Sequence, residues 1–264
     1  MAVKRALNLV TIRDAPLPRK LDVARGARYD GVGLWVNELD GNPGGAEAVA
    51  QLLAQHGLSA AELCFVGGWM YAEQGLQGHS RERAEHAFRL AQALKCGCVV
   101  ACASGASGDL ADAARDFAAL CDLAREFDGR VALEFLGGAE QVKDVRTAWQ
   151  IVDMVDAPNG GLLIDTFHFY KGGSQLADLD PIAGDRVFLV HVNDCLDIPR
   201  EELEDRHRVF PGEGIIPLEP IAAALLDKGY AGFFSLELFN EDYWAADPYL
   251  VAQEGMRSMQ RAGL

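Results

Sequence analysis

The segment GLLIDTFHFY (residues 161–170) passes from an apolar run into Asp165 and reaches His168 three residues later. Three comparable segments are short, apolar and closed by one ionisable residue: VALEF (131–135), VFLVHV (187–192) and FFSLEL (233–238). Near-continuous apolar runs are typical of parallel strands that are buried on both faces. These four segments therefore predict a parallel sheet whose strands end in polar side chains.

Four more apolar runs precede them, which brings the number of expected strands to eight: Ala6–Val10, Gly31–Trp35, Glu62–Val66 and Cys98–Cys102. Amphipathic stretches with helical spacing lie between the runs: Lys20–Arg28, Ala46–His56, Arg81–Lys95, Leu110–Phe127, Val142–Val155, Pro217–Leu226 and Pro248–Arg261. A further helix is expected after Tyr170. Strands that alternate with helices indicate βαβ units and a parallel sheet.

Such a sheet is either a closed barrel or an open, doubly wound sheet. The first strands are not followed by the glycine-rich loop of a dinucleotide fold, because Gly31-Val32-Gly33 lacks a third glycine at the right place. Eight strands in 264 residues match an α/β barrel, which takes roughly 250 residues. We expect a single (β/α)8 TIM barrel domain over residues 1–264, with a long irregular and functional segment over 193–216.

The composition limits the classes of partner. The formal net charge is −15, which disfavours binding to nucleic acid and to anionic membranes and favours a small-molecule substrate. We recognise no signal peptide and no apolar run of membrane-spanning length, so a cytoplasmic protein is expected. Cys96, Cys98 and Cys102 are close in sequence, but a buried strand explains them better than a metal site does. The oligomeric state stays open, and a homo-oligomer is compatible with the sequence.

Four ionisable residues close the last four strands: Glu134, Asp165, His191 and Glu237. Catalytic residues of a TIM barrel project from these carboxyl ends of the strands. Burying three carboxylates together is costly unless a cation compensates their charge. Three carboxylates and one imidazole suit Mn²⁺ or Mg²⁺ and tolerate Co²⁺ or Zn²⁺. The pattern predicts one divalent metal ion at the mouth of the barrel.

Three further residues are candidates for substrate binding. His168 leaves the end of its strand toward the same mouth. Arg208 precedes the tight Pro211-Gly212-Glu213-Gly214 turn, which would hold it in place for hydrogen bonds to substrate oxygens, although a solvated arginine is the alternative. Trp69 follows Gly67-Gly68, where it would either cover a sugar face or serve as a packing residue.

These motifs, together with His191-Val192-Asn193-Asp194 and Ser235-Leu236-Glu237-Leu238-Phe239, resemble those of the xylose-isomerase-like TIM barrels, the sugar phosphate isomerases and epimerases. The resemblance is close from about Val131 to Tyr243, and within the superfamily it is nearest to the 2-keto-myo-inositol (inosose) isomerases of inositol catabolism. It implies a metal bound by Glu134, Asp165, His191 and Glu237, with His168 and Arg208 on the substrate. Many relatives also carry a glutamate at the end of strand two, where Gly31–Trp35 offers none.

The expected reaction is isomerisation of a keto-polyol or sugar through a cis-enediolate, with Glu134 and Glu237 moving the proton. A lyase such as a 3-dehydroshikimate dehydratase and a sugar epimerase are alternatives within the family. Apurinic endonucleases share the barrel, but they need further histidines from the N-terminal half and a less acidic protein. A non-catalytic sugar-binding protein is the remaining alternative.

Overall fold

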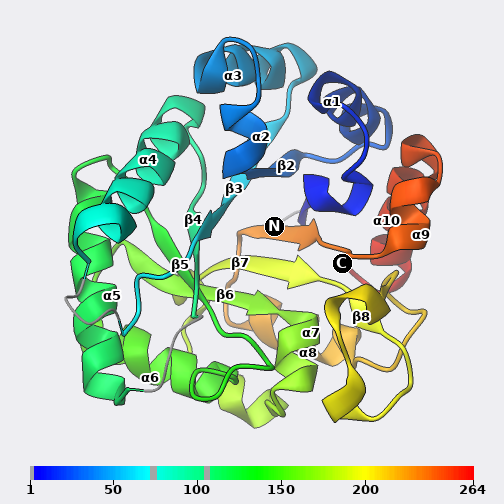
Figure 1. Ribbon diagram of the computed structural model, residues 1–264. Helices are drawn as coiled ribbons and strands as arrows, with labels where there is room; N and C mark the ends of the chain where they lie inside the picture. Colours follow the sequence, from blue (N-terminus) through cyan, green and yellow to red (C-terminus); the bar gives the residue numbers. More distant parts are fainter. Residues whose placement is uncertain (1–2, 72–75, 104–107) are drawn as a thin grey trace.

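Eight parallel strands close into a barrel in the computed structural model, which describes residues 3–71, 76–103 and 108–264 (Figure 1). The neighbours around the barrel follow the chain order. The barrel strands are β1 (Lys4–Asn8), β2 (Gly31–Trp35), β3 (Ser59–Val66), β4 (Val99–Cys102), β5 (Val131–Glu134), β6 (Gly160–Asp165), β7 (Val187–Val192) and β10 (Phe233–Leu236). The expected TIM barrel and all eight strands are confirmed, with boundaries that differ by up to three residues.

Helices surround the barrel on its outside (Figure 1). They are α1 (Leu17–Gly26), α2 (Val36–Asp40), α3 (Gly45–His56), α4 (Gly78–Leu94), α5 (Leu110–Arg125), α6 (Val145–Val155), α7 (Thr166–Lys171), α8 (Leu218–Asp227), α9 (Glu241–Ala245) and α10 (Pro248–Arg261). Aspartates begin several of them: Asp109, Asp144 and Asp247 each accept a hydrogen bond from a backbone N–H of the first turn. The prediction of a helix after Tyr170 is wrong in its position, because α7 begins directly after Asp165 and is followed by two 3₁₀ turns, Leu176–Leu179 and Gly184–Arg186.

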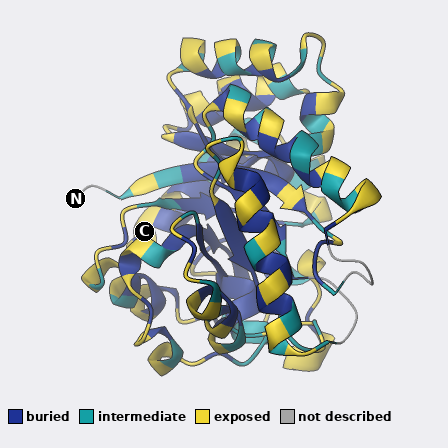
Figure 2. Cartoon of the chain, turned by 90° about the vertical axis from the view of Figure 1, so that its left-hand side faces the viewer, coloured by how far each residue is buried: buried dark blue, intermediate teal, exposed yellow. Residues whose placement is uncertain are grey.

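Side chains of β4, β5 and β6 alternate between two apolar clusters, as the period of two requires. Figure 2 shows the strands as the most deeply buried layer, while the helices keep exposed outer faces. The larger cluster fills the space between barrel and helices, and it includes Val131, Leu133, Leu162 and Ile164. The smaller cluster fills the barrel interior and includes Val100, Ala132, Leu163 and Leu189. The residues two positions further along these strands must also face the barrel interior. They are Cys102, Glu134, Asp165 and His191.

The segment 193–216 is not fully irregular. Asp194–Cys195 (β8) pairs antiparallel with Arg208–Val209 (β9), and 3₁₀ turns cover Arg200–Glu202 and Asp205–His207. This small sheet returns the chain to the barrel mouth, so Arg208 lies beside the strand ends. Among the described residues, no helix is both long and apolar enough to cross a membrane.

Candidate metal centre

Four buried side chains meet at the carboxyl ends of the strands: Glu134, Asp165, His191 and Glu237. One ligand atom from each lies within 4.8 Å of the others. Strand register explains the meeting, since Asp165 is the pairing partner of His191 across β6 and β7. The backbone of Glu237 continues the β10 ladder, because its N–H donates to the carbonyl of Val192 at 3.1 Å. The sequence predicted these four residues, and the structure brings all of them together.

The imidazole of His191 lies at the centre of the cluster. Its Nδ1 is 3.1 Å from Glu237 Oε2, 3.6 Å from Glu134 Oε1 and 3.8 Å from Asp165 Oδ2. Among the described residues, neither ring nitrogen of this buried side chain has a hydrogen-bond partner. Buried polar atoms are rarely left unpaired. The orphaned nitrogens, together with the surrounding carboxylates, fit a bound cation.

Arg208 is the cation that the chain itself supplies. This fully buried residue places Nη1 2.8 Å from Asp165 Oδ2 and 3.0 Å from Glu237 Oε2, while Nη2 lies 2.9 Å from Asp205 Oδ1. The solvated alternative for Arg208 is therefore wrong. One guanidinium does not compensate the three carboxylates of the cluster. The cluster therefore keeps a negative charge that a divalent ion would balance.

The charges shift the pKa values of the cluster in different directions. Burial opposes ionisation of Asp165, but Arg208 and the neighbouring histidines outweigh it and hold the pKa of this carboxyl well below its usual range. Burial raises the pKa of Glu237, although His191 and Arg208 work against it. Burial lowers the pKa of His191, and the opposing effect of Glu237 prevails and raises it well above its usual range. The carboxylates thus differ in proton affinity within one site.

A cavity of about 310 Å³ opens onto this cluster. Glu134, His168, Arg208 and Glu237 provide polar groups of its lining, and Trp35, Phe65, Leu136 and Phe239 provide large apolar ones. His168 is placed by Asp165, whose Oδ1 accepts the backbone N–H of His168 at 2.9 Å and so begins α7. Its Nε2 lies 3.4 Å from Arg208 Nη2. His168 and Arg208 are thus next to the proposed metal ligands.

Trp69 takes the packing role and does not cover the cavity. Its side chain is fully buried, its Nε1 donates to the carbonyl of Cys102 at 3.0 Å, and its ring packs against Phe117. The large aromatic surface beside the cluster belongs instead to Trp35, which contacts Phe65 and Phe239 edge to face. Trp35 ends β2, and its inward direction could have been read from the alternation of that strand.

Sequence reasoning also missed three polar residues that support the cluster. Glu62 is fully buried inside the barrel, and its Oε1 accepts from Ser235 Oγ at 2.7 Å and from Asn8 Nδ2 at 3.2 Å. Asn193 Nδ2 lies 3.2 Å from Asp165 Oδ2, where it orients that carboxylate. Asn8 also donates to Glu237 Oε1 at 3.2 Å. These residues give the ligands fixed directions.

Beside Gly33 of β2, the barrel interior is occupied by the carboxylate of Glu62. A Cβ added at Gly33 would overlap the Glu62 carboxylate and come within 2.9 Å of Asn8 Nδ2. Glycine at this position therefore allows a carboxylate from β3 to enter the barrel from the neighbouring strand.

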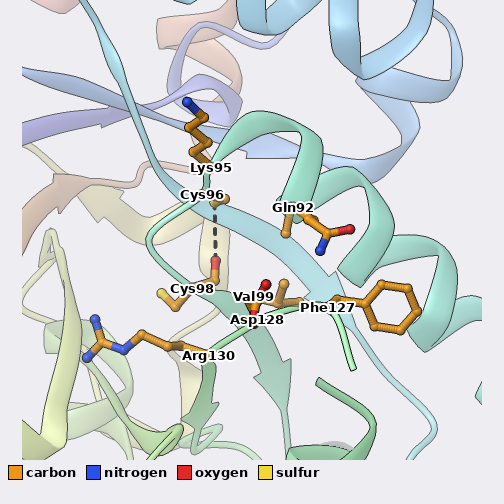
Figure 3. Close-up of a pocket in the computed structure, with 10 residues that line it drawn as sticks. Gln92, Lys95, Cys96, Cys98, Val99, Phe127, Asp128 and Arg130 are labelled. Atoms are coloured by element: carbon orange, nitrogen blue, oxygen red, sulfur yellow. Dashed lines mark hydrogen bonds between the residues drawn. The ribbon is translucent and has the colours of Figure 1, made fainter. Parts of the chain in front are cut away.

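A second hollow of about 240 Å³ lies at the opposite end of the barrel, where β4 and β5 begin (Figure 3). Cys96, Cys98 and Arg130 line it, and Cys96 Sγ donates to the carbonyl of Cys98 at 3.4 Å. Cys102 lies at the other end of β4 beside Glu134. In the described part of the chain these three cysteines form no common metal cluster. This end of a TIM barrel contributes to stability and not to catalysis.

Comparison with known proteins places these features in a family context. A family model described as xylose isomerase-like TIM barrel matches residues 21–262. The chain is 31% identical over 97% of its length to a 3-dehydroshikimate dehydratase of Pseudomonas aeruginosa, of which it covers 41%. It is 36% identical over 53% of its length to an inosose isomerase of Halalkalibacterium halodurans, of which 48% is covered. The chain thus spans about half the length of these relatives or less.

The fold also matches a solved IOLI protein with a bound zinc atom, with a TM-score of 0.86, 23% identity and coverage of 99% and 96% of the two chains. At this identity the match supports the fold alone. The curated relatives are isomerases, epimerases and dehydratases, so the family to which these matches point is one of enzymes.

Proposed function

This chain belongs to the xylose isomerase-like TIM barrel family, and from that premise we propose that it is a metal-dependent isomerase of a small keto-polyol. The observation that carries the proposal is the meeting of four buried ligands at the mouth of a cavity. The reaction we propose is enolisation of a hydroxy-ketone, through a cis-enediolate, followed by return of the proton at the neighbouring carbon. The first substrate to test is 2-keto-myo-inositol.

Glu134, Asp165, His191 and Glu237 would hold one divalent cation of the Mn²⁺, Mg²⁺, Co²⁺ or Zn²⁺ type. The fit rests on the unpaired, buried ring nitrogens of His191 in the described structure and on the oxygen-rich set around them. When bound, such an ion supplies a Lewis acid that stabilises negative charge on a substrate oxygen.

Proton transfer would fall to Glu134 and Glu237. They come from β5 and from the end of β10, strands that β6 and β7 separate in the barrel. Both carboxylates line the cavity, so each can reach a substrate that is bound there. We propose that one removes the α-proton and that the other returns it at the adjacent carbon.

His168 and Arg208 would bind and orient substrate oxygens. Both line the cavity, and Arg208 is held rigidly by carboxylates and by the rings of Phe167 and Phe239, at 4.7 and 5.2 Å from its guanidinium carbon. A fixed donor loses little conformational freedom when a substrate binds.

Dehydration of 3-dehydroshikimate is the second candidate, because the match to the dehydratases extends over 97% of this chain. The first step is shared: a carboxylate of the chain removes a proton next to the ketone. The outcomes differ afterwards, since the dehydratase expels water and forms an aromatic ring. The apolar and aromatic part of the cavity wall suits the ring of 2-keto-myo-inositol as well as that of 3-dehydroshikimate.

The deciding experiment is proton NMR in D₂O with Mn²⁺-loaded protein, in which the ion is removed before spectra are recorded. With 2-keto-myo-inositol we expect deuterium uptake and a new keto-inositol, and both should be lost in Glu134→Gln and Glu237→Gln. Aromatic signals from 3-dehydroshikimate, without reaction of the inosose, would select the dehydratase. The absence of exchange with either compound, by a protein that binds Mn²⁺, would refute the proposed enzyme class for these substrates.

A further inference from the structure

A second set of potential ligands overlaps the first. Cys64, His191 and Glu237 are all buried, and their sulfur, nitrogen and oxygen atoms lie within 4.8 Å of one another. Cys64 is an inward-facing residue of β3, two residues after Glu62, and it lines the same cavity as Glu237. Asn8 Nδ2 lies 3.6 Å from its Sγ and donates to it. The sulfur thus accepts a hydrogen bond from a residue that also contacts Glu237.

The environment of His191 is an independent observation that points to a bound cation. The His191 side chain is 1% exposed, and in the described structure neither ring nitrogen makes a hydrogen bond, although carboxylate oxygens lie near both. The carboxylates of Glu134, Asp165 and Glu237 surround Nδ1, where a cation would bind together with them. The thiol of Cys64 offers the imidazole a softer neighbour than any of the four residues of that set.

The two sets prefer different ions. Carboxylate oxygens favour hard cations, whereas a thiolate with an imidazole favours Zn²⁺ and related thiophilic ions. We propose that Cys64, His191 and Glu237 form a second, overlapping position for a thiophilic divalent cation such as Zn²⁺ or Cd²⁺. The two positions share His191 and Glu237, so one ion is bound at a time. As the sulfur–metal bond forms, the thiol proton leaves to the buffer.

Cadmium is a direct probe, because a cadmium–thiolate bond gives a charge-transfer absorption in the ultraviolet, below the aromatic band of the protein, that carboxylate ligation does not. Metal-free protein of residues 1–264 titrated with Cd²⁺ should gain this absorption up to one equivalent. Cys64→Ser should lose it. Cys102→Ser is the matched control, since Cys102 also lines the cavity and its Sγ donates to Glu134 Oε2 at 3.1 Å, but it lies outside the set of three. The Cys102→Ser variant should retain the cadmium–thiolate absorption.

A second measurement keeps the result interpretable. Electron paramagnetic resonance of free Mn²⁺ should report Mn²⁺ binding in both variants, which verifies that the folded site persists. The affinity ratio of Cd²⁺ over Mn²⁺ should fall at least tenfold in Cys64→Ser and not in Cys102→Ser. An unchanged ratio or a retained absorption in Cys64→Ser would overturn the second position.

This inference rests on the proposed function only through the shared residues His191 and Glu237. The experiments can reject the thiophilic position and the isomerase proposal independently of each other. Mn²⁺ binding without a Cd²⁺ absorption in the unmodified protein would reject the thiophilic position and leave the isomerase proposal intact. A Cd²⁺ absorption that depends on Cys64, in a protein that binds no Mn²⁺, would establish the thiophilic position and reject the hard-metal site.

Discussion

Glu62 Oε1 lies 3.6 Å from His191 Nε2, while Nδ1 of the same ring faces the carboxylates of the candidate metal centre. This separation exceeds a normal hydrogen bond. Metal-binding histidines almost always donate their second N–H to a carboxylate, a carbonyl or water, which fixes the tautomer and the direction of the ring. Glu62 is the carboxylate in that position, and Ser235 and Asn8 hold it there. We infer that it positions His191 for metal binding.

The first prediction concerns Glu62→Gln. The amide keeps the size of the side chain, but it removes the charge that favours a proton on Nε2. We expect the affinity for Mn²⁺ to fall by about 10–100-fold, measured by isothermal titration calorimetry. Asp116→Asn is the control, because Asp116 is equally buried but lies on α5, where it accepts the N–H of Tyr71 at 2.8 Å. Equal Mn²⁺ affinities in Glu62→Gln and the unmodified protein would contradict this role.

The second prediction concerns Gly33→Ala. The added methyl group would overlap the anchored carboxylate of Glu62, so we expect the free energy of unfolding to fall by about 1–3 kcal/mol. Urea denaturation measures this change. The cost should shrink in a Glu62→Ala background, where the overlapping group is absent.

Gly41→Ala provides the matched control for this substitution. Gly41 has an ordinary φ of −81°, and the nearest atom to an added Cβ would be the carbonyl oxygen of Asn37 at 3.4 Å. We expect little change in stability there. An equal cost of Gly33→Ala with and without Glu62 would mean that the clash is not the cause.

The sequence was sufficient to predict the barrel and the clustering of Glu134, Asp165, His191 and Glu237, because both depend on short-range patterns. Asp165 and His191 each end an apolar run, and the ends of neighbouring parallel strands meet regardless of the details of packing. Arg208 could be placed near them because a tight turn follows it. The prediction of the four-residue cluster needed only strand order and direction.

Glu62 and Cys64 could not be found in the same way. The pairing of β2 with β3 shifts between Val32 and Gly33, and the pairing of β3 with β4 shifts between Leu63 and Val66. A register shift changes which residues face inward. The sequence therefore did not tell whether these two side chains enter the barrel. The pair β8–β9 was missed for another reason, since strands of two residues have no readable period.

The third prediction concerns pH and the contact between α1 and α3. His56 Nδ1 lies 2.8 Å from the carbonyl of Leu52, and Nε2 lies 2.9 Å from Asp22 Oδ1. The hydrogen bond to Leu52, and then that to Asp22, raise the pKa of His56 above its ordinary value of 6.5. A raised pKa means that the stabilisation is fully present below pH 6.5 and is lost as the pH rises through the folded-state value.

We therefore expect Asp22→Asn to destabilise the protein more at about pH 5.5 than at about pH 8.5, as measured by urea unfolding. The difference should stay below about 1 kcal/mol, because the Asp22 side chain is 61% exposed and solvent screens the pair. Glu82→Gln is the control, since Glu82 faces the highly exposed His79 at 3.6 Å. A larger effect of Asp22→Asn at high pH than at low pH would reverse the assigned sign.

The last prediction concerns Asp194, which holds the turn after Arg208. Its Oδ2 accepts the backbone N–H groups of Gly212 and Gly214 at 3.0 Å each, and its Oδ1 accepts that of Ile216 at 2.8 Å. Asp194→Asn leaves one acceptor oxygen, so part of this set must lose its partner, at a cost of about 1–3 kcal/mol for a buried donor. Amide hydrogen exchange at Gly212, Gly214 and Ile216 should accelerate. Glu213→Gln, an exposed change in the same turn, should leave exchange unchanged. If Asp194→Asn preserved protection at all three amides, the turn would be stabilised by its glycines and proline alone, and the carboxylate would have no part in placing Arg208.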